Sequence, residues 1–355
     1  MTTYNFCAGP AMLPTEVMAQ AQQQLRDFSQ PGVSVMELSH RSAEFMQVAE
    51  EAEQNLRDLM QIPDNYAVLF MHGGARGQFS AIPLNLLSET GTALYLESGQ
   101  WSVSAAKEAA KFGRVEVRDI RDANSSIDLA KIGATAGYDY VHYCPNETVD
   151  GVSITAVPEC DSPLVADMSS CILGRDLDVS KFALIYAGAQ KNVGPAGLTL
   201  VIVRRDLIGQ AAAHTPAILD YRLAQENDSM YNTPPTFAWY LAGEVFKWIK
   251  ANGGVTAMSA RNQAKAAALY RFIDASDFYR NGVSPIFRSE MNVTFQLQDA
   301  ELNQRFLAQA ESHGLMALKG HRLVGGMRAS IYNAMPMAGV EALIDFMDNF
   351  AQSHQ

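Results

Sequence analysis

The chain has 355 residues, of which 48% are hydrophobic and 18% are charged, as is typical of a folded globular protein. The formal net charge of −11 argues against non-specific nucleic-acid binding, so an anionic ligand would need a local cluster of basic side chains. The four cysteines show neither metal-ligand spacing nor the density of a disulfide framework, so we expect no metal site. The N-terminus lacks the pattern of a signal peptide, and no apolar run is long enough to span a bilayer. We therefore expect a soluble, cytoplasmic protein without a membrane or nucleic-acid partner.

Seven short apolar segments in the first two thirds of the chain are predicted to be buried strands. Each is rich in Val, Ile, Leu or Tyr and is bounded by Gly, Pro or Asp. They cover residues 66–70, 92–98, 114–120, 139–144, 163–168, 182–187 and 198–203. Helical segments alternate with them, including an alanine-rich one that stops at Gly113. This alternation predicts an α/β fold with one mostly parallel, seven-stranded sheet.

The pattern changes after Pro235. Two helices are predicted first, and after them a strand, a helix, a strand and a final helix; the segments are 236–254, 259–274, 292–298, 301–314, 327–333 and 339–350. This order is typical of a smaller α+β unit. We predict a large domain over residues 16–254 and a small C-terminal domain over residues 255–355, with residues 1–15 packed on the small one.

Polar side chains follow the ends of several predicted strands, which is where ligands bind in open α/β sheets. Lys191 follows the sixth strand, Asp167 ends the fifth, and Trp101 follows the second. A glycine-rich turn at residues 72–78 follows the first strand. This set fits pyridoxal phosphate: an amine forms a Schiff base with its aldehyde, a carboxylate keeps its ring nitrogen protonated, and an indole stacks on its ring. The glycine-rich turn and the helix after it offer backbone N–H groups to the phosphate.

Taken singly, each of these features has a simpler explanation. Lys191 alone is typical of a solvated loop, Asp167 of a helix cap, and Trp101 of a core side chain. Their joint occurrence at strand ends favours the cofactor site. A non-catalytic phosphate-binding α/β protein is the alternative from another class. It would explain the glycine-rich turn but not the lysine, the carboxylate and the tryptophan together.

Seven stretches along the chain point to one enzyme family. They include "HGGARGQF", "HYCPNETVDG", "YAGAQKNVGPAG" and "MYNTPPTFAWY", and the full set covers residues 34–42, 72–79, 142–151, 166–170, 186–197, 230–240 and 318–336. With these motifs the whole chain resembles the phosphoserine aminotransferases, which are class V, fold-type I pyridoxal-phosphate enzymes. The resemblance implies a reversible ping-pong transamination in serine biosynthesis, between O-phospho-L-serine or 3-phosphohydroxypyruvate and 2-oxoglutarate or L-glutamate. The same pocket could admit 4-phosphohydroxy-L-threonine, of pyridoxine biosynthesis.

The resemblance assigns cofactor contacts residue by residue. Lys191 would be the Schiff-base lysine, and Asp167 would pair with the ring nitrogen. The remaining contacts would be Trp101 on the ring face, Thr148 at the phenolic oxygen, Ala75, Arg76 and Gln190 at the phosphate, and Asn232 and Thr233 reaching the phosphate from a second subunit. Ala75 stands where relatives often have glycine; it keeps the N–H and adds one methyl group.

Substrate contacts fall, by the same resemblance, on basic residues. Arg328 would take the α-carboxylate. The phosphate or distal carboxylate would be bound by His40 and Arg41, from the partner subunit, and by His321 and Arg322. The resemblance thus implies a homodimer with shared active sites. Without it, these residues would be interpreted as ordinary surface charge.

Two other class V activities can be compared with the sequence. A cysteine desulfurase needs a nucleophilic cysteine well downstream of the lysine, but the last cysteine, Cys171, precedes Lys191. An alanine–glyoxylate-type aminotransferase stays open as the alternative, although a small substrate would not need two His-Arg pairs.

Overall fold

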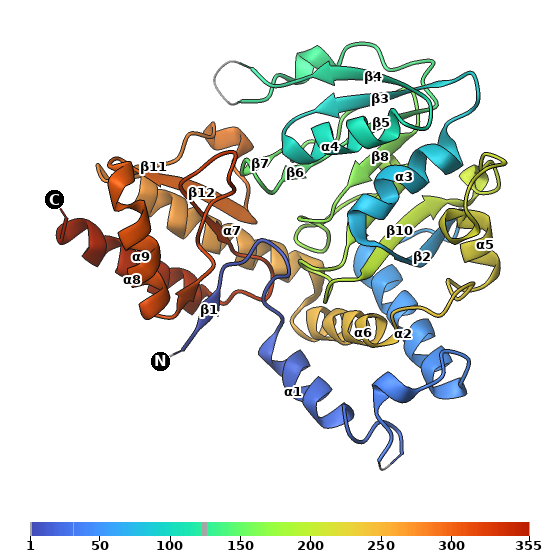
Figure 1. Cartoon of the computed structure of the whole chain (residues 1–355), viewed down its shortest axis with the longest axis horizontal. Coiled ribbons are helices and arrows are strands. Elements are labelled where there is room, and N and C mark those ends of the chain that lie inside the picture. Colours follow the sequence, from blue (N-terminus) through green and yellow to red (C-terminus); the bar gives the residue numbers. More distant parts are fainter. Residues whose placement is uncertain (1, 31, 123–125, 355) are drawn as a thin grey trace.

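The computed structural model describes residues 2–30, 32–122 and 126–354. A larger body, built around one broad sheet, lies beside a smaller body that contains the C-terminal third of the chain (Figure 1). The N-terminal segment runs between the two bodies before the chain enters α1 (Figure 1).

In the described chain, the central sheet of the larger body has seven strands in the order β2-β10-β9-β8-β5-β3-β4. The strands are β2 (Tyr66–His72), β3 (Thr92–Glu97), β4 (Arg114–Asp119), β5 (Tyr140–Tyr143), β8 (Leu164–Asp167), β9 (Leu184–Gly188) and β10 (Leu198–Arg204). All neighbours are parallel except β10, which runs antiparallel to both β2 and β9. The predicted fold class is confirmed, and each predicted strand boundary lies within two residues of the observed one.

Helices cover both faces of this sheet. Alternate residues along β2 show the two faces, because Val68 and Phe70 belong to one buried cluster and Leu69 to another. The first cluster includes side chains of α1 (Thr15–Gln24), α2 (Ala43–Met60) and α6 (Thr236–Ala251), and the second includes side chains of α3 (Gly74–Leu86), α4 (Gln100–Ala109) and α5 (Tyr221–Glu226). Burial on both faces explains why most strands of this sheet are continuous apolar runs, whereas the edge strand β4 is largely exposed and alternates valine with charged residues.

The smaller body has its own buried cluster. Its elements are α7 (Gly254–Asp274), β11 (Tyr279–Arg280), β12 (Asn292–Leu297), α8 (Asn303–Ser312), β13 (Leu315–Met316), β14 (Met327–Ser330) and α9 (Met337–Gln352). The strands β11, β12 and β14 form an antiparallel sheet. The N-terminal strand β1 (Tyr4–Asn5) pairs with β13, and Phe6 is buried in this cluster. The domain boundary at residues 254 and 255 stays a prediction.

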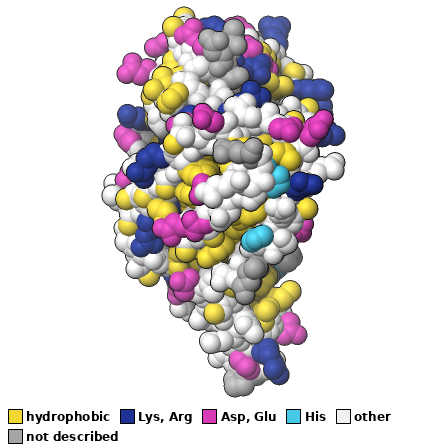
Figure 2. Space-filling model, turned by 90° about the vertical axis from the view of Figure 1, so that its left-hand side faces the viewer, with side chains coloured by type: hydrophobic (Ala, Val, Ile, Leu, Met, Phe, Trp, Pro, Cys, Tyr) yellow, Lys and Arg dark blue, Asp and Glu magenta, His cyan; other side chains and the backbone are white. Residues whose placement is uncertain are grey.

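Short connections complete the chain. A hairpin of β6 (Asn146–Glu147) and β7 (Val152–Ser153) follows β5. Single 3-10 turns lie at Val35–Glu37, Leu129–Ile132, Val179–Lys181, Arg205–Leu207, Ala217–Leu219, Pro285–Phe287 and Ala300–Leu302. Among the described residues, no helix combines the length and the apolar character needed to cross a membrane. Basic and acidic side chains are interspersed on the face shown in Figure 2, around apolar side chains near its middle.

Candidate active site

The carboxyl ends of β5, β8 and β9 meet at one edge of the sheet, and a small pocket lies there. It is lined by Ala75, Trp101, Cys144, Asn146, Thr148, Asp167, Ser169, Ser170, Gly188, Gln190 and Lys191. Six of the residues predicted to contact a cofactor are in this lining, although they come from five separate parts of the sequence. The fold therefore brings together the amine, the carboxylate, the indole and the start of α3.

Lys191 lies in the turn after β9 and is only 8% exposed. Its Nζ donates a hydrogen bond to the hydroxyl of Thr148 at 2.6 Å. Burial lowers the pKa of Lys191, and the nearby Asp167 carboxylate acts in the opposite direction. A lysine whose pKa is lowered by burial spends more time as the neutral amine, which is the form that attacks a carbonyl.

The two neighbours of Lys191 hold its turn in place. The Asn192 side chain donates to the carbonyl of Ile172 at 2.9 Å and accepts from the Asn333 N–H at 3.0 Å. The Gln190 carbonyl accepts from the Ala11 N–H at 2.8 Å. These bonds tie the lysine turn to the N-terminal segment on one side and to the smaller body on the other.

Asp167 ends β8 and is 5% exposed. Its Oδ1 accepts hydrogen bonds from the backbone N–H of Ser169 at 2.9 Å and from the Ser169 hydroxyl at 2.5 Å. That hydroxyl also accepts from the Gly188 N–H at 3.0 Å. Burial raises the pKa of Asp167, while the Ser169 bonds favour the ionised form. The carboxylate is thus held in one orientation at the pocket wall.

Trp101 lies in the first turn of α4, and two cations lie near its ring. The Lys191 Nζ lies 5.8 Å from the ring centroid, and the Arg76 guanidinium carbon lies 5.4 Å from it. The indole Nε1 is buried and has no hydrogen-bond partner within the described chain. A buried indole N–H normally has an acceptor, so this atom points to a missing polar partner.

Glu147 is a residue to which the sequence analysis gave no role. It is fully buried and accepts hydrogen bonds from the backbone N–H groups of Trp101 and Ser102, both at 2.8 Å, and from the Ser102 hydroxyl at 2.7 Å. Burial raises the pKa of Glu147 to about 7 against the effect of these bonds. The carboxylate caps α4, which begins after Gly99, a residue with no side chain to cap it. The sequence signal that could have pointed to Glu147 is the start of α4, where Gly99 has no side chain to cap the helix.

The predicted glycine-rich turn proves to be the beginning of α3. Gly73, with φ of 93°, precedes the helix, and Ala75 and Arg76 lie in its first turn. Backbone N–H groups of a first helical turn have no partner within the helix, and they attract anions. A Cβ atom on Gly188 would lie 3.1 Å from the Ala75 nitrogen, so glycine lets the end of β9 approach these groups. The pocket thus offers a phosphate site at its α3 end.

Together these features fit pyridoxal phosphate. The pocket holds a buried amine, a carboxylate, the free end of a helix for a phosphate, and an aromatic ring with an unpartnered N–H. The ring of Trp101 offers a flat surface for a cofactor ring to stack on.

The smaller body contributes Arg328, on β14. Its guanidinium donates to the carbonyl of Thr148 at 3.3 Å, so it lies beside the residue that contacts Lys191. Burial lowers the pKa of Arg328 but leaves an arginine cationic. A cation at this position can bind a carboxylate next to the amine.

Eight predicted residues are absent from the lining of this pocket within the described chain: Arg76 and Arg328, which lie close to Trp101 and Thr148, and His40, Arg41, Asn232, Thr233, His321 and Arg322. Arg41, Asn232, Thr233 and Arg322 are exposed. His321 accepts a hydrogen bond from the Leu323 N–H at 3.3 Å and so supports its own loop. Their predicted roles are untested by one isolated chain and stay predictions.

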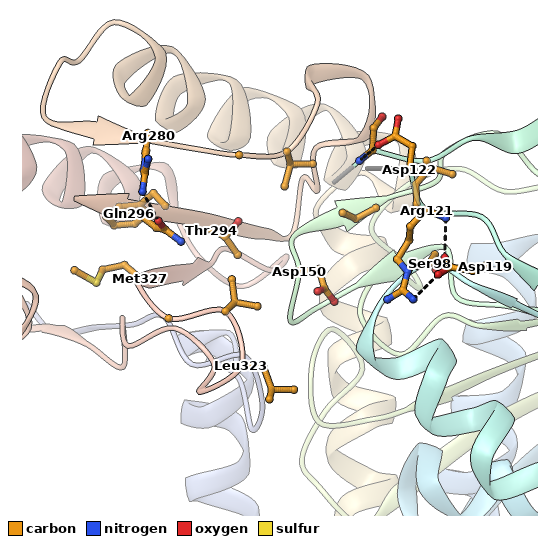
Figure 3. Close-up of a pocket in the computed structure, with 18 residues that line it drawn as sticks. Ser98, Asp119, Arg121, Asp122, Asp150, Arg280, Thr294, Gln296, Leu323 and Met327 are labelled. Atoms are coloured by element: carbon orange, nitrogen blue, oxygen red, sulfur yellow. Dashed lines mark hydrogen bonds and ion pairs between the residues drawn. The ribbon is translucent and has the colours of Figure 1, made fainter. Parts of the chain in front are cut away.

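A larger cavity of about 640 Å³ lies between the two bodies (Figure 3). Ser98, Asp119 and Asp150 lie on the wall from the larger body, and Thr294 and Gln296 on the facing wall (Figure 3). Its basic side chains are already engaged, because Arg121 pairs with Asp119 at 2.7 Å and Arg280 donates to Gln296 at 3.1 Å. The reactive groups lie in the smaller pocket, so cavity size alone does not locate the site.

Comparison with known proteins agrees with this site. The family model described as aminotransferase class V matches residues 3–343, which is nearly the whole chain. The chain is thus a class V aminotransferase.

Comparison with solved structures identifies the family within this class. Phosphoserine aminotransferase from Bacillus circulans subsp. alkalophilus is 44% identical, with a TM-score of 0.96 and coverage of 100% of this chain and 99% of that one. The enzyme from Trichomonas vaginalis, with pyridoxal phosphate bound, is 37% identical, with a TM-score of 0.91 and coverage of 98% and 100%. A Thermus thermophilus aspartate aminotransferase, 18% identical over 99% of both chains with a TM-score of 0.81, shares the fold alone. The chain belongs to the phosphoserine aminotransferase family.

Proposed function

We propose that this protein is a pyridoxal-phosphate-dependent transaminase that exchanges an amino group between O-phospho-L-serine and 2-oxoglutarate. The main support is that Lys191, Asp167, Trp101 and the start of α3 line one pocket, in a chain 44% identical over its full length to a phosphoserine aminotransferase. Placed in serine biosynthesis, the reaction would run from 3-phosphohydroxypyruvate and L-glutamate.

The bound cofactor supplies an aldehyde that condenses with amines and a ring that accepts electrons. Lys191, with its pKa lowered, can take a proton from the substrate Cα as a neutral amine, and the resulting ammonium would give that proton to the carbon of the cofactor's aldehyde group. Thr148, hydrogen-bonded to Lys191, holds that amine in place. Asp167 would hold the proton on the ring nitrogen, and the Trp101 ring would fix the plane of the ring.

The basic residues account for a substrate with two anionic ends. Arg328, close to Thr148, would bind the α-carboxylate, because a guanidinium fork matches a carboxylate. The His40-Arg41 and His321-Arg322 pairs would bind the phosphate, or the distal carboxylate of glutamate. In a chain with a net charge of −11, such a local cluster is needed to attract a doubly anionic substrate.

Complete active sites would require a homodimer. His40, Arg41, Asn232 and Thr233 are outside the pocket of their own chain, and three of them are exposed. A two-fold dimer would bring the same residues of each subunit to the other's pocket. A cytoplasmic location goes with a biosynthetic enzyme of this kind and is part of the proposal.

The absorbance spectrum of the purified protein tests the reaction. We expect a yellow protein whose colour fades with O-phosphoserine and returns with 2-oxoglutarate. A yellow protein that responds to alanine but not to phosphoserine would instead support an alanine–glyoxylate-type aminotransferase. A colourless protein that does not respond to added pyridoxal phosphate would contradict transamination and support a phosphate-binding protein.

A further inference from the structure

A second line of buried polar groups lies behind Asp167, on the face of the sheet covered by α3 and α4. The Nε2 atom of His142, on β5, lies 2.9 Å from the hydroxyl of Tyr186, on β9. Tyr186 is also the register partner of Asp167, on β8, and its hydroxyl lowers the pKa of the Asp167 carboxyl. None of the three side chains is more than 5% exposed.

Strand register places these side chains on one face. Asp167 is opposite Tyr186, and His142 is opposite Val165, two residues before Asp167 on β8. Side chains two residues apart on a strand share a face, and so do register partners on adjacent strands. The line of polar groups therefore crosses three neighbouring strands and ends at Asp167, in the lining of the pocket.

Packing holds both rings in position. Tyr95 stacks on His142 with ring centroids 4.6 Å apart and planes 22° apart. Phe79 packs edge-on against Tyr186, with centroids 6.3 Å apart. Neither ring can turn away without losing these contacts.

The ionisation states of the three side chains determine which atom along this line carries each proton. Burial lowers the pKa of His142 to about 3, so its imidazole is neutral and carries one N–H; burial also raises the pKa of Tyr186, so its hydroxyl keeps its single proton. An ionised Asp167 can only accept, so the Tyr186 proton must point toward it. The Tyr186 oxygen is then the acceptor for His142, and the imidazole proton must lie on Nε2.

The unpartnered Nδ1 of His142 agrees with this assignment. Nδ1 is buried and has no hydrogen-bond partner in the described residues. A bare nitrogen lone pair in this position costs less than a buried N–H donor without an acceptor. The tautomer with the proton on Nδ1 would leave such a buried donor unpaired.

We propose that His142 is a positioning residue, which donates through Nε2 to Tyr186 so that the Tyr186 hydroxyl donates to Asp167 and holds that carboxylate ionised toward the cofactor nitrogen. This inference rests on the proposed function, because only the proposed function makes the ring nitrogen of the cofactor the partner of Asp167. His142 itself touches neither cofactor nor substrate.

Two substitutions at position 142 separate hydrogen bonding from packing. His142→Gln keeps an N–H donor but loses the ring that stacks on Tyr95, whereas His142→Phe keeps a ring and loses the donor. We expect His142→Phe to weaken pyridoxal-phosphate binding by the apoprotein and to lower kcat, each about tenfold, as for one lost hydrogen bond. His142→Gln should stay within about threefold of the wild type, since it keeps that bond. The reverse order would overturn the proposal in favour of a packing role.

Tyrosine variants provide the matched control. Tyr186→Phe should reproduce the loss seen in His142→Phe, and the double variant should be no worse than Tyr186→Phe alone. Tyr66→Phe removes another buried tyrosine hydroxyl of the same sheet, one that donates to the Phe182 carbonyl, and should leave cofactor binding unchanged. Additive losses at positions 142 and 186 would contradict a single line of hydrogen bonds.

Nitrogen-15 NMR of the apoprotein tests the tautomer without the reaction. The His142 signals are identified by their absence from His142→Gln, and we expect the proton on Nε2. A proton on Nδ1 would overturn the proposal even if the enzyme transaminates phosphoserine. Conversely, a wild-type protein that fails to bind pyridoxal phosphate would contradict the proposed function, while the tautomer would still decide whether the line exists.

Discussion

Individual residues in and behind the pocket have ionisation properties that the fold imposes. Burial lowers the pKa values of Lys191 and His142 and raises those of Asp167 and Glu147. Each shift disfavours the charged form, and hydrogen bonds or nearby opposite charges then restore part of that form where it is useful. Strongly perturbed groups that lie together in a pocket are typical of a catalytic site.

Lys191 is the residue on which the proposed reaction depends most. Lys191→Ala should abolish turnover, because no other side chain supplies an amine at the same position, and the protein should still fold. Assays with phosphoserine would measure the turnover, and circular dichroism would show whether the protein folds.

Asp167→Asn should retain some cofactor but lose most of the rate, since an amide does not hold a protonated ring nitrogen. A near-normal rate in either variant would rule out the corresponding role.

His142 should make the native state sensitive to acid. Its pKa falls from an ordinary 6.5 to about 3 in the folded protein, so below pH 6.5 the unfolded chain binds a proton that the native state does not. Stability therefore falls as the pH drops from 6.5 toward 3. Between pH 7 and pH 5, His142→Gln should lose about 2 kcal/mol less unfolding free energy than the wild type.

Urea unfolding of the apoprotein at a fixed protein concentration would measure this difference. His214→Gln, at an exposed histidine, is the control and should show the wild-type loss. An identical acid response in all three proteins would mean that His142 is protonated in the native state.

At the scale of secondary-structure elements, α4 depends on a side chain from another segment. Glu147 closes the start of this helix and holds the backbone of Trp101. An anion is favourable at a helix start, where the N–H groups are unpaired. The orientation of the Trp101 ring is therefore set by the β6–β7 hairpin as well as by its own helix.

Glu147→Gln should destabilise the protein and weaken cofactor binding. An amide offers one acceptor oxygen where the carboxylate has two, and its NH₂ group would face N–H donors. We expect a loss of about 2 kcal/mol at pH 5 and a smaller loss at pH 8, because with a pKa of about 7 the native carboxyl is protonated at pH 5 while that of the unfolded chain is mostly ionised, so the wild type gains stability as the pH falls and the amide does not. Urea unfolding and cofactor titration would measure the two effects.

The matched control is Glu108→Gln, near the other end of α4, where the carboxylate pairs with Lys111 at the surface. That substitution should change stability by less than about 0.5 kcal/mol. Equal effects at positions 108 and 147 would contradict a special role for the buried cap.

At the scale of the whole molecule, the proposed function requires two subunits. If Arg41 serves the partner's pocket, coexpressed Lys191→Ala and Arg41→Ala chains should form mixed dimers with one intact site. Random pairing makes half of the dimers mixed, so about a quarter of wild-type activity should return. The measurement compares the activity of the coexpressed protein with the activity of each inactive variant alone.

A second mixture shows whether any recovery is specific. Lys191 and Asp167 line the same pocket of one chain, so coexpressed Lys191→Ala and Asp167→Asn chains should leave every site defective. Recovery in this mixture would mean that activity arises from something other than shared sites. Failure of the first mixture to recover would place Arg41 outside the partner's site.

The fold was largely predictable from sequence, and the pocket partly so. Short segments rich in Val, Ile, Leu or Tyr located the seven strands of the central sheet in the described chain, and the parallel arrangement brought Lys191, Asp167 and Trp101 to one edge. Glu147 and His142 were harder, because their roles depend on neighbours across strands and not on local pattern. The antiparallel direction of β10 could not be predicted from the sequence either, since a buried strand has the same composition in either direction.

The pairing of β1 with β13 has a consequence for synthesis on the ribosome. Tyr4 emerges long before its strand partner Leu315 is made. Phe6 cannot reach its buried position until the cluster that covers it, built from residues 266–351, has been made. The central sheet can form earlier, since its last strand ends at residue 204. The N-terminal segment, whose Ala11 N–H donates to the Gln190 carbonyl in the turn of Lys191, therefore takes its final position only after the smaller body has been made.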